Sequence, residues 1–208
     1  MSTVTIDGRR TEFEPGATLL EAVRAAGGAV PTLCFDERQE PFGACRVCLV
    51  AADGAVVAAC TTKCRDGMAV ETGDDRARRV ARGVVELVLS ELPEAPAPHT
   101  ELATVARDLD AGEPGWPGPT HTPRHDTTHP YLAFRHELCI SCGRCIRACD
   151  EVQGTFALTA TGRGFDANVA AGLDQGFRDS ACVSCGACAD TCPTDAITEH
   201  TLLDQVMA

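Results

Sequence analysis

The chain has 208 residues and a formal net charge of −12 at pH 7. This length suits one or two domains and excludes a large multidomain enzyme. The strong acidity argues against nucleic acid or an anionic membrane surface as a partner. Residues 1–30 contain no signal-peptide pattern, and the longest apolar run, 84–89, is interrupted by Glu86 and too short to cross a bilayer. We therefore expect a soluble, cytoplasmic protein whose thiols stay reduced.

Residues 1–74 are expected to form a small domain of mixed strands and helix. One pair of short strands flanks a turn at Asp7-Gly8 and a second pair flanks Asp53-Gly54, because Asp-Gly is a favoured hairpin turn. Between the two pairs, a helix is expected after Thr18, which has the spacing of a capping box with Glu21, and it ends before a Gly-Gly pair.

Residues 75–130 are expected to contain one strong helix followed by a linker. Residues 75–91 have helical periodicity, with an apolar stripe that includes Val80, Val84 and Leu87. Residues 93–130 are rich in Pro, Ala, Gly and His, and one short amphipathic stretch, "TELATVARDLD", interrupts them. Histidines recur at positions 121, 125 and 129, but the prolines and threonines around them favour a linker over a metal site.

The strongest signal is an internal repeat in the C-terminal domain, residues 131–208. "CISCGRCIRAC" at 139–149 and "CVSCGACADTC" at 182–192 share the spacing C-x2-C-x2-C-x3-C. In this spacing the first three cysteines bind three corners of a [4Fe–4S] cluster, and the fourth binds the other cluster. The expected ligands are Cys139, Cys142, Cys145 and Cys192 for the first cluster, and Cys182, Cys185, Cys188 and Cys149 for the second.

Two glycines and one departure from the usual pattern accompany this repeat. Gly143 and Gly186 allow backbone N–H groups to approach the cluster sulfurs. Pro193 follows the second run in the usual way, whereas Asp150 follows the first, which leaves the ligands intact and puts the local turn in question. Zinc or a disulfide knot is the alternative explanation of these cysteines, although a zinc site often uses two well-separated C-x2-C pairs.

The N-terminal domain carries a third set of cysteines. Cys34, Cys45, Cys48 and Cys60 have the spacing C-x10-C-x2-C-x11-C, which suits a [2Fe–2S] cluster although it is not the plant-type spacing. Cys64 is the thirteenth thiol, and twelve ligands fill three clusters. We expect Cys60 to be the ligand because it ends an apolar, strand-like run, and Cys64 to be a small side chain beside the cluster.

These motifs carry a family resemblance. "GACRVCLV", "AACTT", "RDGM" and the tandem repeat resemble an iron–sulfur module that three redox families share. The families are the small diaphorase subunit of NAD-reducing hydrogenases, the N-terminus of the large peripheral subunit of respiratory complex I, and the N-terminal part of NAD-dependent molybdenum or tungsten formate dehydrogenases. The resemblance covers residues 1–90 and 131–200. It implies an α+β chain with a β-grasp-like [2Fe–2S] domain and a bacterial-type double [4Fe–4S] domain.

The chain departs from these families after the predicted helix. In the families a His and three Cys follow that helix and bind an additional [4Fe–4S] cluster. Here Leu92 stands at the position of the His, and no cysteine occurs between Cys64 and Cys139. We therefore expect that cluster to be absent and His99 to be a lone surface or capping residue. "CIRACDEVQG" and "CVSCGACADTCPTDAIT" look closest to the formate dehydrogenase version.

The resemblance implies an electron-transfer subunit with no catalytic residues of its own. The sequence has neither a G-x-G-x-x-G pattern after a strand nor a P-loop, so nucleotide chemistry is expected on another chain. The expected partners are a flavin- and NAD-binding chain and a molybdenum- or tungsten-pterin chain that oxidises formate. A diaphorase-type subunit of an NAD-reducing [NiFe] hydrogenase is the alternative. A zinc-binding interaction module is the alternative from another class.

Overall fold

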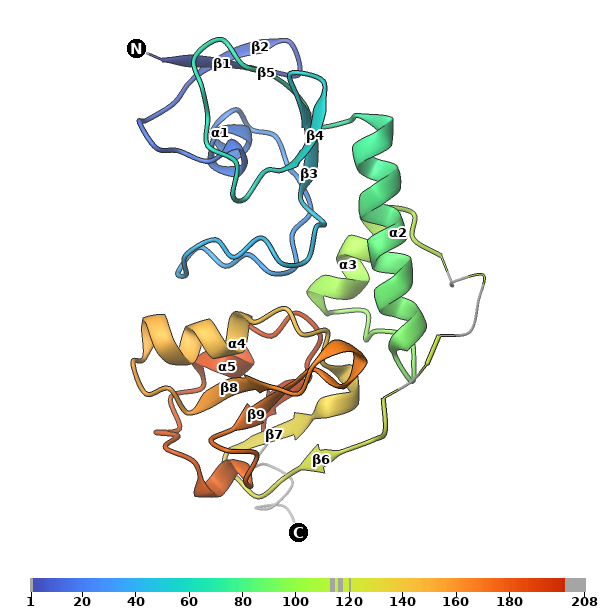
Figure 1. Ribbon diagram of the computed structural model, residues 1–208, viewed down its shortest axis with the longest axis vertical. Coiled ribbons are helices and arrows are strands. Elements are labelled where there is room, and N and C mark those ends of the chain that lie inside the picture. Colours follow the sequence, from blue (N-terminus) through green and yellow to red (C-terminus); the bar gives the residue numbers. More distant parts are fainter. Residues whose placement is uncertain (1, 113–114, 116–117, 120, 201–208) are drawn as a thin grey trace. The chain divides into compact units, whose positions relative to one another are not determined.

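The computed structural model describes residues 2–112, 115, 118–119 and 121–200, and Figure 1 labels its elements. The chain divides into two compact units. Unit 1 comprises Met1–Phe35, Pro41–Ser90 and Leu102–Pro117, and unit 2 comprises Asp36–Glu40, Glu91–Glu101 and Gly118–Ala208. The C-terminal unit therefore includes a five-residue segment, Asp36–Glu40, that the sequence places inside the N-terminal domain.

Unit 1 is built on a five-stranded sheet in the order β2-β1-β5-β3-β4. Strands β1 and β5 are parallel, and the other neighbouring pairs are antiparallel. The strands are β1 (Thr3–Ile6), β2 (Arg9–Glu12), β3 (Leu49–Ala52), β4 (Ala55–Ala58) and β5 (Ala69–Glu71). Both predicted hairpins are confirmed: Asp7 and Gly8 in the first turn, and Asp53 and Gly54 in the second, all have positive φ, as the favoured two-residue hairpin turn requires.

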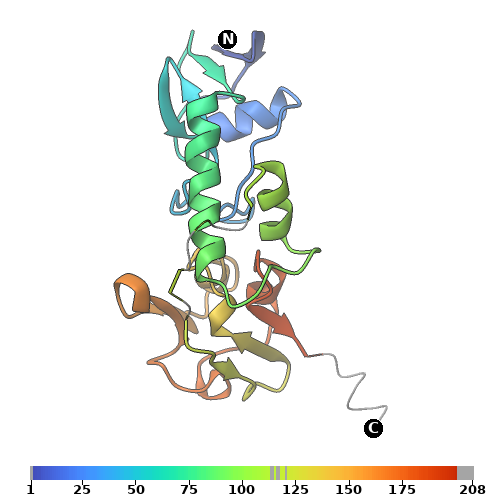
Figure 2. The same ribbon diagram turned by 90° about the vertical axis from the view of Figure 1, so that its right-hand side faces the viewer.

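Helix α1 (Leu19–Ala25) lies beside this sheet, as Figure 2 shows. The predicted capping box is present. The Glu21 N–H donates to the Thr18 hydroxyl, and the Glu21 carboxylate accepts from the Thr18 N–H at 2.6 Å. Leu19, Leu20 and Val23 are fully buried in the core of unit 1. The sheet and α1 together confirm the predicted β-grasp-like arrangement of the N-terminal domain.

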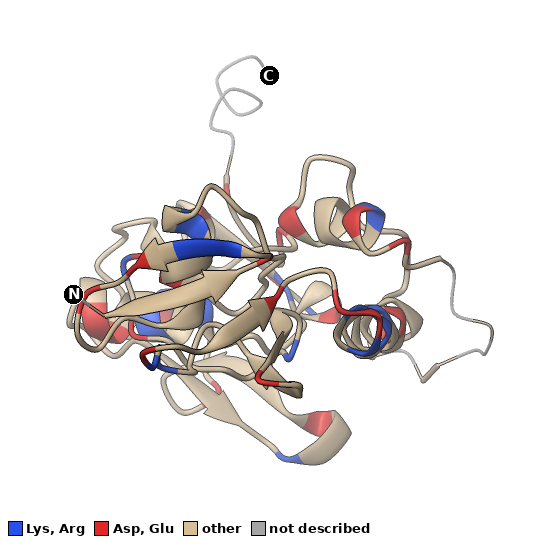
Figure 3. Ribbon diagram, turned by 90° about the horizontal axis from the view of Figure 1, so that it is seen from above, with Lys and Arg blue, Asp and Glu red and all other residues tan. Residues whose placement is uncertain are grey.

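Helix α2 (Asp75–Glu91) has the predicted bounds, but it buries a different face from the predicted stripe. Ala77, Ala81 and Val85, spaced four residues apart, are buried, whereas the side chains of Val80 and Leu87 are 50% and 53% exposed. Burial depends on which face of a helix its neighbours cover, so it need not follow the most hydrophobic stripe of the sequence. Figure 3 shows α2 nearly end-on, with its arginines in blue.

The segment expected to be a linker contains regular structure. Helix α3 (Glu101–Asp108) forms from the amphipathic stretch and buries Leu102 and Val105. Strand β6 (His125–Asp126) pairs with the C-terminal sheet. Residues 113–114, 116–117 and 120 of the expected linker lie outside the described residues, as do residues 201–208 of the expected C-terminal domain.

Unit 2 holds two small antiparallel sheets and short helices. Strands β10, β7 and β6 form one sheet, and β8 and β9 form a hairpin. The remaining elements are β7 (Leu132–Arg135), β8 (Leu158–Thr161), β9 (Asn168–Ala171), β10 (Ile197–Glu199), α4 (Arg144–Arg147), α5 (Ala187–Asp190) and 3-10 turns at His136–Leu138, Gly164–Asp166 and Phe177–Asp179. Three cysteines belong to its buried hydrophobic core, and three more are partly buried and pack against it: Cys145, Cys149 and Cys188, and Cys139, Cys182 and Cys192. The α+β class is therefore confirmed in both units.

The local turn after Cys149 explains why Asp150 replaces the usual proline. Helix α4 continues into a π-helical turn at Ala148–Val152, closed by a hydrogen bond from the Gln153 N–H to the Ala148 carbonyl at 3.1 Å. A proline at position 150, inside this continuous helical segment, would be unfavourable because its ring clashes with the carbonyl four residues earlier. Among the described residues, no helix is long and apolar enough to cross a membrane.

Candidate metal centres

The four N-terminal cysteines converge in unit 1. Cys34, Cys48 and Cys60 are buried, and the Cys45 N–H donates to the Cys34 sulfur at 3.4 Å. Hydrogen bonds from the Cys45 and Cys60 thiols lower the pKa of Cys34 to about 2. A hydrogen bond from Cys60 likewise lowers the pKa of Cys48 to about 7. Two of the four sulfurs therefore favour the thiolate form, which is the form that binds iron. The same hydrogen bonds raise the pKa of the two donor thiols, Cys45 and Cys60.

A close backbone approach holds the ligand loop of this set. Gly43 has a φ of +69°, and a side-chain carbon at this position would come within 2.8 Å of the Thr61 Cγ2. Only glycine fits both the left-handed conformation and the contact. The loop before Cys45 therefore lies against the turn that carries Cys60.

Cys64 has a different hydrogen-bond partner from these four thiols. Its sulfur donates to the Thr18 carbonyl oxygen at 3.4 Å, at the start of α1. Burial raises the pKa of the Cys64 thiol, which favours the neutral form. The geometry thus groups Cys60, and not Cys64, with Cys34, Cys45 and Cys48.

In unit 2, one cavity is lined by the four cysteines expected for the first [4Fe–4S] cluster. Cys139, Cys142 and Cys145 come from the first run of the repeat, and Cys192 comes from the end of the second run. Apolar side chains from β7, β9 and β10 complete the lining: Phe134, Val169 and Ile197.

A second cavity is lined by Cys149, Cys182, Cys185 and Cys188. Its apolar walls include Leu132, Leu158 and Phe177. Each cavity therefore takes three cysteines from one run and the fourth from the other. In each cavity the four cysteines line a space instead of converging on one position, as a single metal ion would require. Four thiols in an apolar wall therefore fit a cluster of several irons.

The two runs of the repeat have the same backbone conformation. Ser141 and Ser184 have φ values of 51° and 59°, and Gly143 and Gly186 have φ values of 75° and 77°. Each glycine directly precedes a short helix, α4 or α5. This left-handed turn allows backbone N–H groups to point at sulfur atoms.

Several backbone N–H groups donate to cysteine sulfurs in unit 2. The Ala157 N–H donates to Cys149 at 3.2 Å and the Ser184 N–H donates to Cys182 at 3.4 Å. Burial raises the pKa of Cys142 and of Cys188 to about 12. Burial therefore disfavours the free thiolates of Cys142 and Cys188, and a positive metal centre would favour them.

The histidines of the expected linker have separate partners. His125 Nε2 lies 2.7 Å from a Glu137 carboxylate oxygen, and His121 stacks on Phe165 with ring centroids 4.2 Å apart. His129 is buried, and its Nδ1 accepts from the N–H groups at the start of β7. Within the described ranges, no group of three or more His, Cys, Asp or Glu side chains is arranged to hold a single metal ion.

One polar network beside the first cavity was missed by sequence reasoning. Asp36, Arg144 and Thr191 are buried and hydrogen-bonded to one another. The signal was present but weak: an arginine inside the "CGRC" of the first run, and an aspartate two residues after Cys34. Pairwise contacts across more than a hundred positions leave no local pattern in a single sequence.

Two ferredoxin-type domains, each with converging thiols, define the class as an iron–sulfur electron-transfer protein. Residues 1–75 match the family described as "2Fe-2S iron-sulfur cluster binding domain", and residues 138–196 match "4Fe-4S dicluster domain". A solved structure of an NAD+-reducing [NiFe]-hydrogenase in the H2-reduced state contains a chain with 30% identity and a TM-score of 0.87, over 96% of this chain and 88% of that one.

Curated relatives agree with the structural match. The NADP-reducing hydrogenase subunit HndD of Solidesulfovibrio fructosivorans is 32% identical over 100% of this chain and 37% of its own length. An NADH-quinone oxidoreductase component of Rhizobium meliloti is 31% identical over 81% of this chain and 21% of its own length. The mitochondrial NADH-ubiquinone oxidoreductase 78 kDa subunit of Neurospora crassa is 28% identical over 94% of this chain and 27% of its own length.

The chain therefore belongs to the family of iron–sulfur subunits shared by NAD(P)-linked hydrogenases and complex I, which confirms the resemblance seen in the motifs. It spans between about a fifth and about two fifths of the length of these curated relatives.

Proposed function

We propose that the chain binds one [2Fe–2S] and two [4Fe–4S] clusters and relays single electrons within an NAD-linked dehydrogenase complex. The observation that carries the proposal is the grouping of twelve cysteines into three sets of four, two of them lining separate apolar cavities. When bound, such clusters supply one-electron transfer at potentials set by charge, hydrogen bonding and exposure.

The proposed ligands follow the three sets. The sets are Cys34, Cys45, Cys48 and Cys60 for the [2Fe–2S] cluster, Cys139, Cys142, Cys145 and Cys192 for the first [4Fe–4S] cluster, and Cys149, Cys182, Cys185 and Cys188 for the second. The chain's own part is to hold these thiols, exclude water with apolar walls, and donate N–H groups to the sulfurs.

Iron analysis of anaerobically purified, full-length chain tests this proposal. Three clusters correspond to about ten irons per chain. Stoichiometric zinc with a colourless protein would support the interaction module and overturn the proposal. About fourteen irons would reveal a fourth cluster, which the absence of cysteines between Cys64 and Cys139 opposes.

For the complex, we propose a flavin- and NAD-binding chain as one partner and a substrate-oxidising metal chain as the other, in the cytoplasm. A flavin is the expected converter because hydride chemistry moves electrons in pairs and clusters move them singly. The sequence motifs around both [4Fe–4S] sites favour a molybdenum or tungsten formate dehydrogenase as the second partner.

A hydrogenase is the second candidate, because two of the similar proteins are hydrogenases by name. Metal analysis of the native complex separates the two, since molybdenum or tungsten indicates formate oxidation and nickel indicates hydrogen oxidation. The isolated chain, free of flavin, should turn over neither formate, hydrogen nor NADH with an artificial acceptor. Turnover by the isolated chain would contradict its role as a relay.

A further inference from the structure

The polar network around Arg144 joins four distant parts of the chain within unit 2. Arg144 is the first residue of α4 and stands between the proposed ligands Cys142 and Cys145. Its side chain is only 6% exposed, and the Asp36 side chain is 7% exposed. A buried arginine beside a cluster site requires partners for its charge, because an unpaired buried charge is strongly unfavourable.

Each arm of the Arg144 guanidinium has a separate acceptor. Nε donates to the Thr191 hydroxyl at 2.9 Å, and the two terminal nitrogens lie 2.6 Å from Glu101 and 3.5 Å from Asp36. The Thr191 hydroxyl in turn donates to the same Asp36 carboxylate oxygen at 2.7 Å. Since Thr191 directly precedes Cys192, the network bridges both ligand segments of the first [4Fe–4S] site.

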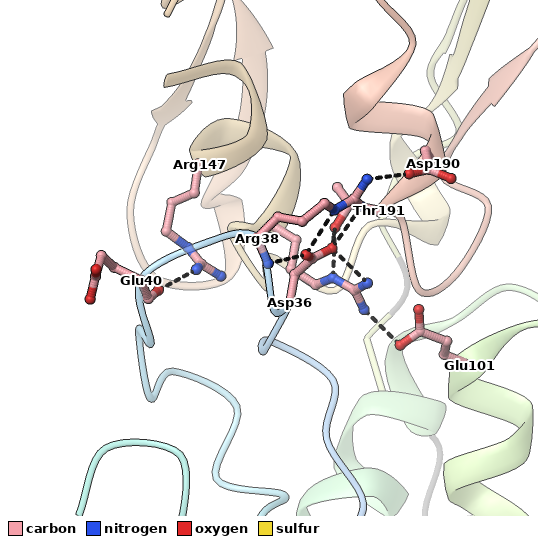
Figure 4. A network of polar contacts seen from close by, with 8 residues as sticks. Asp36, Arg38, Glu40, Glu101, Arg147, Asp190 and Thr191 are labelled. Carbon is pink, nitrogen blue, oxygen red and sulfur yellow. Dashed lines mark hydrogen bonds and ion pairs between the residues drawn. The ribbon is translucent and has the colours of Figure 1, made fainter. Parts of the chain in front are cut away.

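Asp36 brings a third segment to this site. The chain enters unit 2 at Asp36 and leaves it after Glu40, inside the interval between Cys34 and Cys45. Figure 4 shows Asp36 at the centre of the contacts, with Arg38 reaching Asp190 at 2.6 Å.

Further hydrogen bonds hold the other end of the segment 36–40. Arg147 donates to the Glu40 carbonyl at 2.7 Å, and the Glu40 N–H donates to Glu151 at 2.7 Å. Both partners lie within or beside the first run of the repeat. The segment is thus fixed at both ends to residues that flank ligands of the [4Fe–4S] sites.

We propose that Asp36 and Arg144 form a positioning pair that couples the ligand loop of the [2Fe–2S] site to the first [4Fe–4S] site. The Asp36 carboxylate supplies a negative charge beside the first [4Fe–4S] site. In return, hydrogen bonds from Arg144 and Thr191, which flank ligands of that site, hold the loop that follows Cys34. This inference rests on the proposed function, since it requires both clusters. Because coupling between two sites is reciprocal, a change in the loop should alter the potential of the first [4Fe–4S] cluster.

The test removes the charge of Asp36 and of Arg144 in turn and measures the midpoint potentials of the [4Fe–4S] clusters. The measurement uses the anaerobically purified full-length chain. Asp36→Asn removes a negative charge and should raise the midpoint potential of one [4Fe–4S] cluster, because the reduced cluster is the more negative form. Arg144→Gln should lower that potential. The double variant should return it to near the wild-type value. A purely structural defect would shift both single variants in the same direction, and that result would overturn the proposal.

The matched controls are Arg124→Gln and Asp174→Asn. These residues form an ion pair of 2.8 Å in the same unit, but both side chains are nearly half exposed, so solvent screens their charges. Both controls should leave the potentials unchanged. A shift in a control equal to that in the pair would show an effect of net charge alone and would overturn the inference.

Hydrogen exchange of the segment 36–40 tests the anchoring independently of redox measurements. Asp36→Asn and Thr191→Val should increase amide exchange there by about tenfold, because the segment loses a buried anchor. If Asp36→Asn fails to assemble clusters, Thr191→Val tests the same contact without a charge change. Unchanged exchange in Thr191→Val would refute the anchoring. A wild-type chain without reducible [4Fe–4S] clusters would instead refute the proposed function.

Discussion

The comparison of Cys60→Ala with Cys64→Ala tests the proposed [2Fe–2S] ligands most directly. Cys60 is buried just after β4 and its thiol contacts the Cys34 and Cys48 sulfurs, so its removal leaves three ligands for a four-ligand cluster. We expect Cys60→Ala to lose most of the [2Fe–2S] signal, and with it about two of about ten irons. Alanine is preferable to serine because a serine oxygen can itself bind iron.

Cys64→Ala provides the matched control. The Cys64 thiol donates a hydrogen bond to the Thr18 carbonyl at 3.4 Å. Loss of one such bond lowers the free energy of unfolding by about 0.5–1.5 kcal/mol. The [2Fe–2S] signal should therefore keep its full intensity in this variant, with a small decrease in stability.

Electron paramagnetic resonance of the reduced proteins, with spin and iron quantified per chain, measures both effects. Urea unfolding measures the stability change in Cys64→Ala. A full [2Fe–2S] signal in Cys60→Ala together with its loss in Cys64→Ala would refute the assignment. Loss in both variants would show that Cys64 also supports the cluster site, contrary to its assignment as a hydrogen-bond donor to the Thr18 carbonyl alone.

Three further predictions concern residues outside the cluster sites. Thr18→Ala removes the capping box with Glu21 and should destabilise unit 1 by about 1 kcal/mol, measured by urea unfolding. His99→Ala should leave the iron content unchanged, because His99 pairs with Asp195 at 2.5 Å and has no thiol partner among the described residues; loss of four irons would contradict this. At Asp126, burial raises the carboxyl pKa, but hydrogen bonds to the carboxylate outweigh it and lower the native pKa. Its stabilising contribution should be complete above an unfolded-state pKa of about 3.9 and disappear as the pH falls through the native pKa. The difference in stability between wild type and Asp126→Asn should therefore shrink at acid pH. A difference that grows there would contradict a lowered pKa of Asp126 in the native state.

Much of the local structure could be predicted because it depends on neighbouring residues. The Asp-Gly turns, the capping box at Thr18 and the bounds of α2 follow from backbone conformations and short-range hydrogen bonds, and all are present. The buried face of α2 could not be predicted in the same way. Its Val80 and Leu87 look like core residues, but burial depends on which neighbours pack against the helix, and the structure buries Ala77, Ala81 and Val85.

The sequence by itself determined the chemistry of the chain. Three cysteines at spacings of two residues can reach one cluster only through local turns, so the iron–sulfur character and the twofold repeat are readable in short segments. The same reasoning identified the [2Fe–2S] motif and the family. Cysteine spacing is a property of covalent connectivity, which does not depend on how the rest of the chain packs.

Only the tertiary structure decided which distant groups share an environment. It joined Asp36 to Thr191 across 155 positions and to Arg144 across 108. Such contacts arise because burial of a charge requires a compensating partner, wherever in the chain that partner lies. No spacing rule along the sequence encodes that requirement.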